Sequence, residues 1–165
     1  MAKKEEAPAA ATENPVEGQN FVIHRMYLKD LSFEAGETPQ IFQAEWKPQM
    51  NFDMNSQHHK VADDTFEVVL HATLTTKIED KTAYIAEVQY AGIFTIRDYD
   101  DQQLDALLKS YCPTVIYPYM REVFADVVNK GSFPQAHIAP INFDAIYAQN
   151  LQAQQEQAKT QGEVQ

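Results

Sequence analysis

The chain has 165 residues, a single cysteine and a net charge of −11. This length fits one domain with a buried core, and the negative charge argues against nucleic-acid or anionic-membrane binding and favours basic partners. Because Cys112 has no second cysteine to pair with, and because we find no secretory signal or membrane-spanning run, we expect a soluble cytoplasmic protein.

Composition divides the chain into three parts. Residues 1–20 are rich in Ala, Glu and Pro and are predicted to form a disordered N-terminal tail. Residues 21–151 form the folded body. Residues 152–165 continue a glutamine-rich stretch with almost no large apolar side chains, so we expect a mobile polar tail there.

Four β-strands are predicted at the start of the folded body. They cover residues 21–35, 49–57, 64–78 and 82–96. The second has a clear period of two, which places Met50, Phe52 and Met54 on one face. The last two are long β-rich runs separated only by Glu-Asp-Lys, and this spacing predicts a hairpin.

The first predicted strand has one face that changes character along its length. Strict alternation places Tyr27, Leu31 and Phe33 on one side of the strand. The other side begins with the apolar residues Val22, Met26 and Leu28 and continues with Asp30, Ser32 and Glu34. A face that is apolar at one end and acidic at the other calls for a functional explanation.

Helices are predicted after the strands. Leucines at helical spacing indicate a helix over residues 100–111, with Asp100 or Asp101 as its N-cap and Pro113 ending it. A second helix is expected over residues 117–131, with Gly131 at its C-terminal end. Asn142 is expected to cap a last helix.

This order of elements predicts an α+β fold, in which a four-stranded antiparallel sheet carries a layer of helices on one face. Large apolar residues nevertheless fall on both faces of the first and fourth strands. We therefore expect the protein to form oligomers through the sheet face that the helices leave open.

Catalytic and metal-binding interpretations find little support. Cys112 lies between apolar helical segments without a glycine-rich elbow, which favours a buried packing role. His58 and His59 are adjacent, so they point apart on an extended chain and form no metal pair. The acidic residues at 63–64 and 98–101 fit turn formation and helix capping. We predict no enzymatic activity, no cofactor and no bound metal.

The long connection over residues 35–49 is a candidate binding segment, since such loops are often functional. Its aromatic residues either hold the loop against the core or line a groove for apolar segments of other chains. The residues of this predicted groove are Ile41, Phe42, Trp46, Met50, Phe52 and Met54. Methionine and aromatic side chains suit varied apolar partners because they can repack.

Several segments of the chain resemble the SecB protein-export chaperones. They are YLKDLSFEA, the W-x-P of Trp46 to Pro48, ADDTFEVVL, EVQYAGIF, YCPTVIYPYMRE and GSFPQAHIAPINFDAIY, in family order over residues 21–151. The resemblance implies an ATP-independent cytoplasmic chaperone that holds unfolded secretory precursors and delivers them to the SecA ATPase. It also implies a homotetramer built as a dimer of dimers.

The resemblance further implies a docking site for the basic C-terminal tail of SecA. The matching positions are Asp30, Ser32, Glu34, Ile85 and Glu87. The alternative is that these carboxylates only keep the sheet surface soluble. Two other functions remain open for the whole chain: a small-molecule carrier with a Phe42/Trp46 pocket, and a purely structural oligomer.

Overall fold

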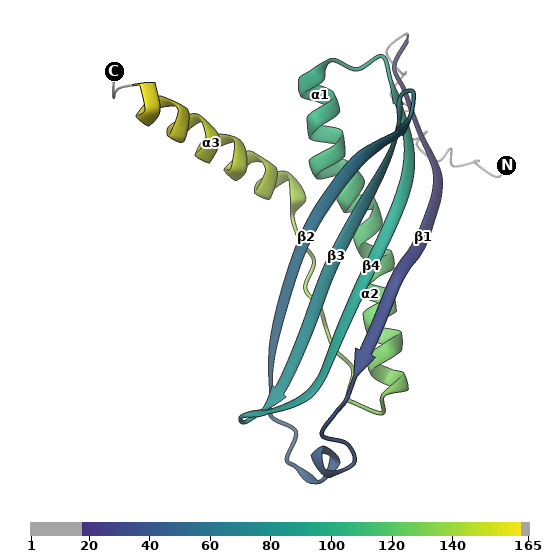
Figure 1. Cartoon of the computed structure of the whole chain (residues 1–165), viewed down its shortest axis with the longest axis vertical. Helices are drawn as coiled ribbons and strands as arrows, with labels where there is room; N and C mark the ends of the chain where they lie inside the picture. Colours follow the sequence, from purple (N-terminus) through teal and green to yellow (C-terminus); the bar gives the residue numbers. More distant parts are fainter. Residues whose placement is uncertain (1–17, 163–165) are drawn as a thin grey trace, which may run out of the picture.

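The structure is a computed structural model that describes residues 18–162, so most of the predicted N-terminal tail lies outside the described residues. Its strands are β1 (Asn20–Glu34), β2 (Pro48–Ala62), β3 (Thr65–Ile78) and β4 (Lys81–Arg97). They form one antiparallel sheet in the order β1-β4-β3-β2, as Figure 1 shows. A short 3-10 helix, η1 (Gln40–Gln43), lies in the connection between β1 and β2.

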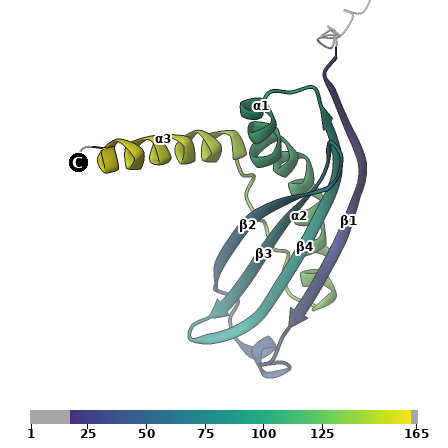
Figure 2. The same cartoon turned by 45° about the horizontal axis from the view of Figure 1, so that its top comes forward.

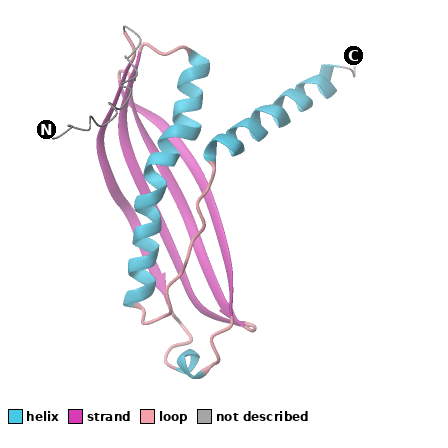
Figure 3. Ribbon diagram, turned by 180° about the vertical axis from the view of Figure 1, so that it is seen from behind, coloured by secondary structure: helices cyan, strands magenta, loops and turns pink. Residues whose placement is uncertain are grey.

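The helices follow the sheet, as predicted. They are α1 (Asp101–Ala106), the π-helical turn η2 (Leu107–Tyr111), α2 (Cys112–Lys130) and α3 (Phe143–Gly162). The first three form one continuous rod that crosses a single face of the sheet (Figure 3). The core lies between this rod and the sheet, where Leu70, Val88 and Phe94 meet Ile116 and Phe124. The α+β fold is thus confirmed.

Pro113 does not end a helix, contrary to the sequence prediction. The chain remains helical from Asp101 to Lys130, because the π-turn ends two residues before the proline and the N–H of Cys112 reaches back to the carbonyl of Leu107. A proline ring clashes with the carbonyl one turn earlier in a regular α-helix, and a wider turn relieves that clash. The two predicted helices are therefore one element.

Two β-bulges in β1 correct the predicted strand faces. The register is interrupted between Ile23 and Arg25 and again between Leu28 and Asp30. Each bulge adds a residue and shifts the alternation, because two residues then stand opposite one on the partner strand. Leu28 and Asp30 consequently lie on opposite faces, with Leu28 on the helix side. The face that carries Asp30 begins with Val22, Arg25 and Tyr27. Strict alternation placed Val22 correctly on this face, but it also placed Met26 and Leu28 there, and both lie on the helix side.

The open face of the sheet is more polar than the sequence suggested. The positions of β3 and β4 that face away from the helices include Thr73, Thr75, Glu87 and Gln89, with Ile85 and Ile93 among them. The larger exposed apolar side chains of β1, such as Leu28 and Leu31, are on the helix side. Association through the open face remains a prediction. Much of the exposed apolar surface of β1, on which that prediction was based, lies on the helix side instead.

The chain reaches its last helix by an extended segment, residues 131–142, that runs back along the helix side of the sheet (Figures 1 and 3). Asn142 caps α3 as predicted, since its side-chain oxygen accepts a hydrogen bond from the N–H of Ala145 at 3.0 Å. Figure 2 shows α3 projecting away from the sheet. Residues 152–159 are exposed along it, and their predicted mobility remains a prediction. Among the described residues, no helix is long and apolar enough to cross a membrane.

Candidate functional site

All five residues of the predicted SecA site come together on the open face. Ser32 of β1 stands opposite Glu87 of β4, Glu34 stands opposite Ile85, and Asp30 stands opposite Gln89. Paired residues of antiparallel strands point to the same side of a sheet. The bulge at residues 28–30 is what brings Asp30 to this side. The result is a patch of carboxylates on β1 and β4 around the side chain of Ile85.

A fourth carboxylate, Asp53, extends this patch, although it was not among the predicted site residues. Glu87 stands opposite Thr73 of β3, and Thr73 stands opposite Asp53 of β2, so Asp53 lies in the same transverse row. We define the acidic patch as Asp30, Glu34, Asp53 and Glu87. Within the described part of the chain, none of these carboxylates has a cationic partner within 4.0 Å. The patch therefore presents uncompensated negative charge.

A buried carboxylate lies farther along the same face. The Glu67 side chain is only 7% exposed, although it is on the face opposite the helices. Its Oε1 accepts hydrogen bonds from the Tyr27 hydroxyl and from Nζ of Lys29, the latter at 2.8 Å. Its Oε2 lies 2.9 Å from Nε2 of His59. These contacts connect β1, β3 and β2 across β4, where Ala91 stands opposite Tyr27 and Ile93 stands opposite Glu67.

The partners of Glu67 determine its ionisation. Burial disfavours the charged carboxylate, but the hydrogen bonds from Lys29 and Tyr27 and the charges of Lys29 and His59 outweigh burial, so the pKa of Glu67 lies below its ordinary value. Burial, together with the hydrogen bond to the Glu67 carboxylate and its charge, raises the pKa of Tyr27 to about 12. Glu67 is accordingly an anion held by donors from two other strands.

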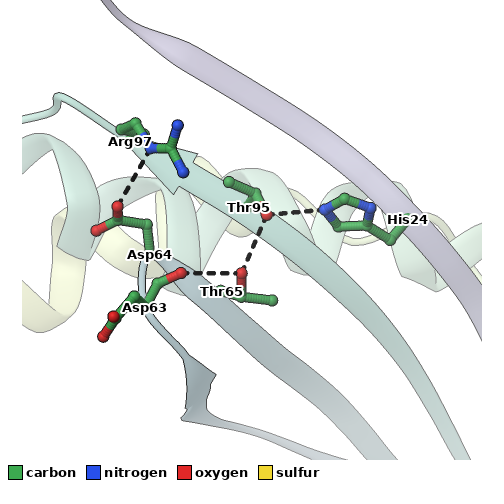
Figure 4. Close-up of polar contacts among 6 residues, drawn as sticks. All are labelled: His24, Asp63, Asp64, Thr65, Thr95 and Arg97. Atoms are coloured by element: carbon green, nitrogen blue, oxygen red, sulfur yellow. Dashed lines mark hydrogen bonds and ion pairs between the residues drawn. The ribbon is translucent and has the colours of Figure 1, made fainter.

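The end of the sheet near the β2–β3 turn carries a second set of polar contacts, drawn in Figure 4. Nε2 of His24, the extra residue of the first bulge, lies 2.7 Å from the Thr95 hydroxyl, which in turn lies 3.1 Å from the Thr65 hydroxyl. Arg97 donates a hydrogen bond to Asp64 at 3.2 Å. Asp64 has a positive φ of 52°, which fits the turn predicted for this position. These contacts hold strand ends together.

The loop residues of the predicted groove surround one buried ring that the sequence analysis missed. The Phe133 ring lies 5.2 Å from the Phe42 ring and 5.9 Å from the Trp46 ring, centre to centre. It also lies 4.9 Å from Tyr84 of β4. Phe133 is buried and Trp46 is half-buried, whereas Phe42 is 50% exposed. The two loop aromatics therefore pack against a buried ring from the extended segment that follows α2.

A cavity of about 200 Å³ lies at this aromatic cluster. Its lining residues are Ile41, Phe42, Ala44, Trp46, Ser132, Phe133 and Pro134. Ile41 is 4% exposed and belongs to the core, so it forms the floor of the cavity. Small-molecule sites usually enclose about 300–1,000 Å³, which makes this hollow small for a carrier pocket but suitable for one apolar side chain.

The strand residues of the predicted groove continue from the loop along β2, at the edge of the sheet. Met50, Phe52 and Met54 stand opposite alternate residues of β3 on its helix side. Met50 is 44% exposed, whereas the Phe52 ring packs edge-on against Phe124 at 5.7 Å. Met54 lines a larger cavity of about 510 Å³ between β2, the helical rod and α3. The β2 row, defined as Met50, Phe52 and Met54, thus leads from an exposed methionine to the larger cavity.

The described residues that the sequence offered as catalytic or metal-binding candidates lie in other settings. Burial raises the pKa of the Cys112 thiol to about 12, so this cysteine is a poor nucleophile. His58 and His59 stand opposite Val68 and Glu67, on different faces of the sheet. In the described residues, no group of three or more potential metal ligands comes together.

Comparisons with known proteins identify the family. The family model for the preprotein translocase subunit SecB matches residues 14–154. The chain belongs to the SecB family. It is 49% identical to the protein-export protein SecB of Marinobacter nauticus over 154 residues, 93% of each chain. It is 46% identical to that of Idiomarina loihiensis, over 98% of this chain and 97% of that one.

The fold agrees with this assignment. The structure of a SecB-like chaperone from Mycobacterium tuberculosis, solved with a ChAD peptide from the HigA1 antitoxin, superposes with a TM-score of 0.62. It is 16% identical in sequence and covers 73% of this chain and 90% of its own. As a SecB protein, the chain is a protein-export chaperone, a class of binding protein rather than of enzyme.

Proposed function

We propose that this SecB protein separates its two binding tasks between the two sides of its sheet. Apolar segments of unfolded precursors, its clients, bind along the helix side, in the aromatic cavity and on the β2 row. SecA binds on the open face, at the acidic patch. The observation that carries this division is that the two sets of residues point to opposite faces of one sheet.

Client binding on the helix side is supported by the exposure of large apolar groups there. Phe42 and Met50 are 50% and 44% exposed. Phe42 lines the aromatic cavity, and Met50 lies on the same face of β2 as Phe52. An extended client segment presents apolar side chains at intervals, so separate hollows suit it better than one closed pocket. Flexible methionines adapt to different side chains, which a chaperone with many clients needs.

SecA docking is supported by the carboxylates of the acidic patch, none of which forms an ion pair with a described residue. The family resemblance implies a basic tail on SecA, and opposite charges accelerate and orient such an encounter. Ile85, half-buried between Glu34 and Glu87, offers an apolar contact within the patch. Because clients must be delivered to SecA before they are exported, the chaperone would bind them in the cytoplasm.

Assembly into a tetramer, a dimer of dimers, is supported by the edge strand β1 rather than by the open face. Ile23, Leu28 and Leu31 are 44%, 43% and 41% exposed on its helix side. Tyr111 and Tyr119 of the helical rod are each 49% exposed. A long edge strand with unpaired backbone groups and apolar side chains readily pairs with another copy of itself.

Binding of SecA to charge variants tests the proposed division. Asp30→Ala and Glu87→Lys should both weaken binding, and the reversal at Glu87 should weaken it more because it replaces attraction with repulsion. Affinity measured by calorimetry should fall as salt rises, since the Debye length is only about 10 Å at 0.1 M. Both variants should still hold clients. Normal SecA binding together with lost client holding would reverse the assignment of the two faces.

A further inference from the structure

Lysine 29 is a cation placed directly beside the acidic patch. It is the extra residue of the second bulge in β1, so Lys29 and Asp30 stand together opposite Gln89. The Lys29 side chain is 41% exposed. A free lysine at this position would neutralise part of the patch, because opposite charges this close on a surface attract each other even in water.

Lys29 instead turns to Glu67. Its Nζ lies 2.8 Å from Oε1 of a carboxylate that is itself only 7% exposed. Tyr27 donates to the same oxygen, and His59 approaches the second oxygen. Because these groups keep the pKa of Glu67 low, the carboxylate remains charged at neutral pH and retains its hold on the lysine.

We propose that Glu67 acts as a positioning residue that sequesters Lys29 and so keeps the acidic patch free for a cationic partner. This inference rests on the proposed docking of SecA at the patch. Two features support it: the patch carboxylates have no cationic partner in the described residues, although a lysine is next to one of them in sequence. The second feature is that the positive charge of Lys29 is paired with Glu67, in a cluster of contacts that joins β1, β3 and β2.

A purely structural role for Glu67 predicts a different pattern of mutant effects. If the contact only stabilises the sheet, removing either partner weakens everything, and removing both repairs nothing. If Glu67 sequesters Lys29, then Glu67→Gln releases a positive charge beside Asp30, and removing that charge restores binding. The double variant with Lys29→Met therefore separates the two roles.

The experiment measures binding of two probes, a hexalysine peptide and a peptide of the SecA C-terminal tail, at low salt. Glu67→Gln should weaken hexalysine binding about two- to fivefold, as expected for one added charge at an exposed site. Adding Lys29→Met should return the affinity to the wild-type value or above it. The matched control is Glu45→Gln, which releases Lys47 from an exposed pair away from the sheet face and should leave binding unchanged.

The other possible results overturn the positioning role of Glu67, the docking of SecA at the acidic patch, or both. Failure of Lys29→Met to rescue Glu67→Gln, or an equal loss in Glu45→Gln, overturns the positioning role. If Glu67→Gln does not fold, Lys29→Met alone decides, because sequestration predicts tighter hexalysine binding and a structural role predicts weaker binding. A wild-type protein that binds hexalysine but not the SecA peptide refutes SecA docking and leaves the role of Glu67 standing. One that binds neither overturns both.

Discussion

Two substitutions in the aromatic cluster, Phe133→Ala and Phe42→Ala, distinguish a ring that stabilises the fold from a ring that contacts clients. Phe133 is 5% exposed, and four rings lie with their centres 4.9–6.3 Å from its own. Replacing a buried phenylalanine by alanine costs about 3–5 kcal/mol. Phe42 is 50% exposed, so Phe42→Ala loses only half of a full burial energy, about 1 kcal/mol.

We therefore expect Phe133→Ala to lower the free energy of unfolding by about 3–5 kcal/mol, and Phe42→Ala by about 1 kcal/mol. Client affinity should respond in the opposite order for the folded proteins, since Phe42 is the ring that a client can reach. Denaturant unfolding at one fixed protein concentration measures the first quantity, and titration with an unfolded precursor measures the second. The reasoning is refuted if Phe42→Ala destabilises the protein as much as Phe133→Ala and leaves client binding intact.

Three further predictions concern other parts of the surface. Trp46→Ala should weaken client binding by about 2 kcal/mol while light scattering still shows a tetramer; unchanged affinity would make Trp46 a core residue. Because the pKa of Glu67 is lowered by folding, its stabilisation is complete above the unfolded pKa of about 4.3 and disappears as pH falls through the folded pKa. Glu67→Gln should thus flatten the acid side of the stability curve, and an unchanged slope would contradict this. Leu28→Lys should break the assembly into smaller species, whereas Ile85→Lys should not; the opposite pattern would favour association through the open face.

Much of the fold follows from local patterns in the sequence. Alternation predicts the first two strands and β-rich composition predicts the last two, although β2 continues to Ala62, past its predicted end at residue 57. Asp100 forms the capping box that its position before the helix suggests. The predicted SecA-site residues lie together because the two strands that carry them, β1 and β4, are neighbours in the sheet. Pairing of this kind is accessible from sequence only through the family resemblance.

The misassigned strand faces have a non-local cause. The bulges at His24 and Lys29 are accompanied by contacts with Thr95 and Glu67, which are far away in the chain. A single glutamate within a β-rich run is typical of a solvent-facing position, so nothing local indicates that Glu67 is buried. Phe133 was missed for the same reason, since its four ring neighbours come from three other segments of the chain.

The main activity expected of this SecB protein is to hold unfolded chains, and the refolding kinetics of a client measure that activity. The measurement follows a reduced, slowly folding secretory precursor diluted from denaturant, without nucleotide, at increasing amounts of this protein. We predict that near-stoichiometric amounts delay folding, that Trp46→Ala reduces the delay, and that Glu87→Lys leaves it unchanged. A precursor that folds at its own rate in the presence of excess wild-type protein would contradict the account.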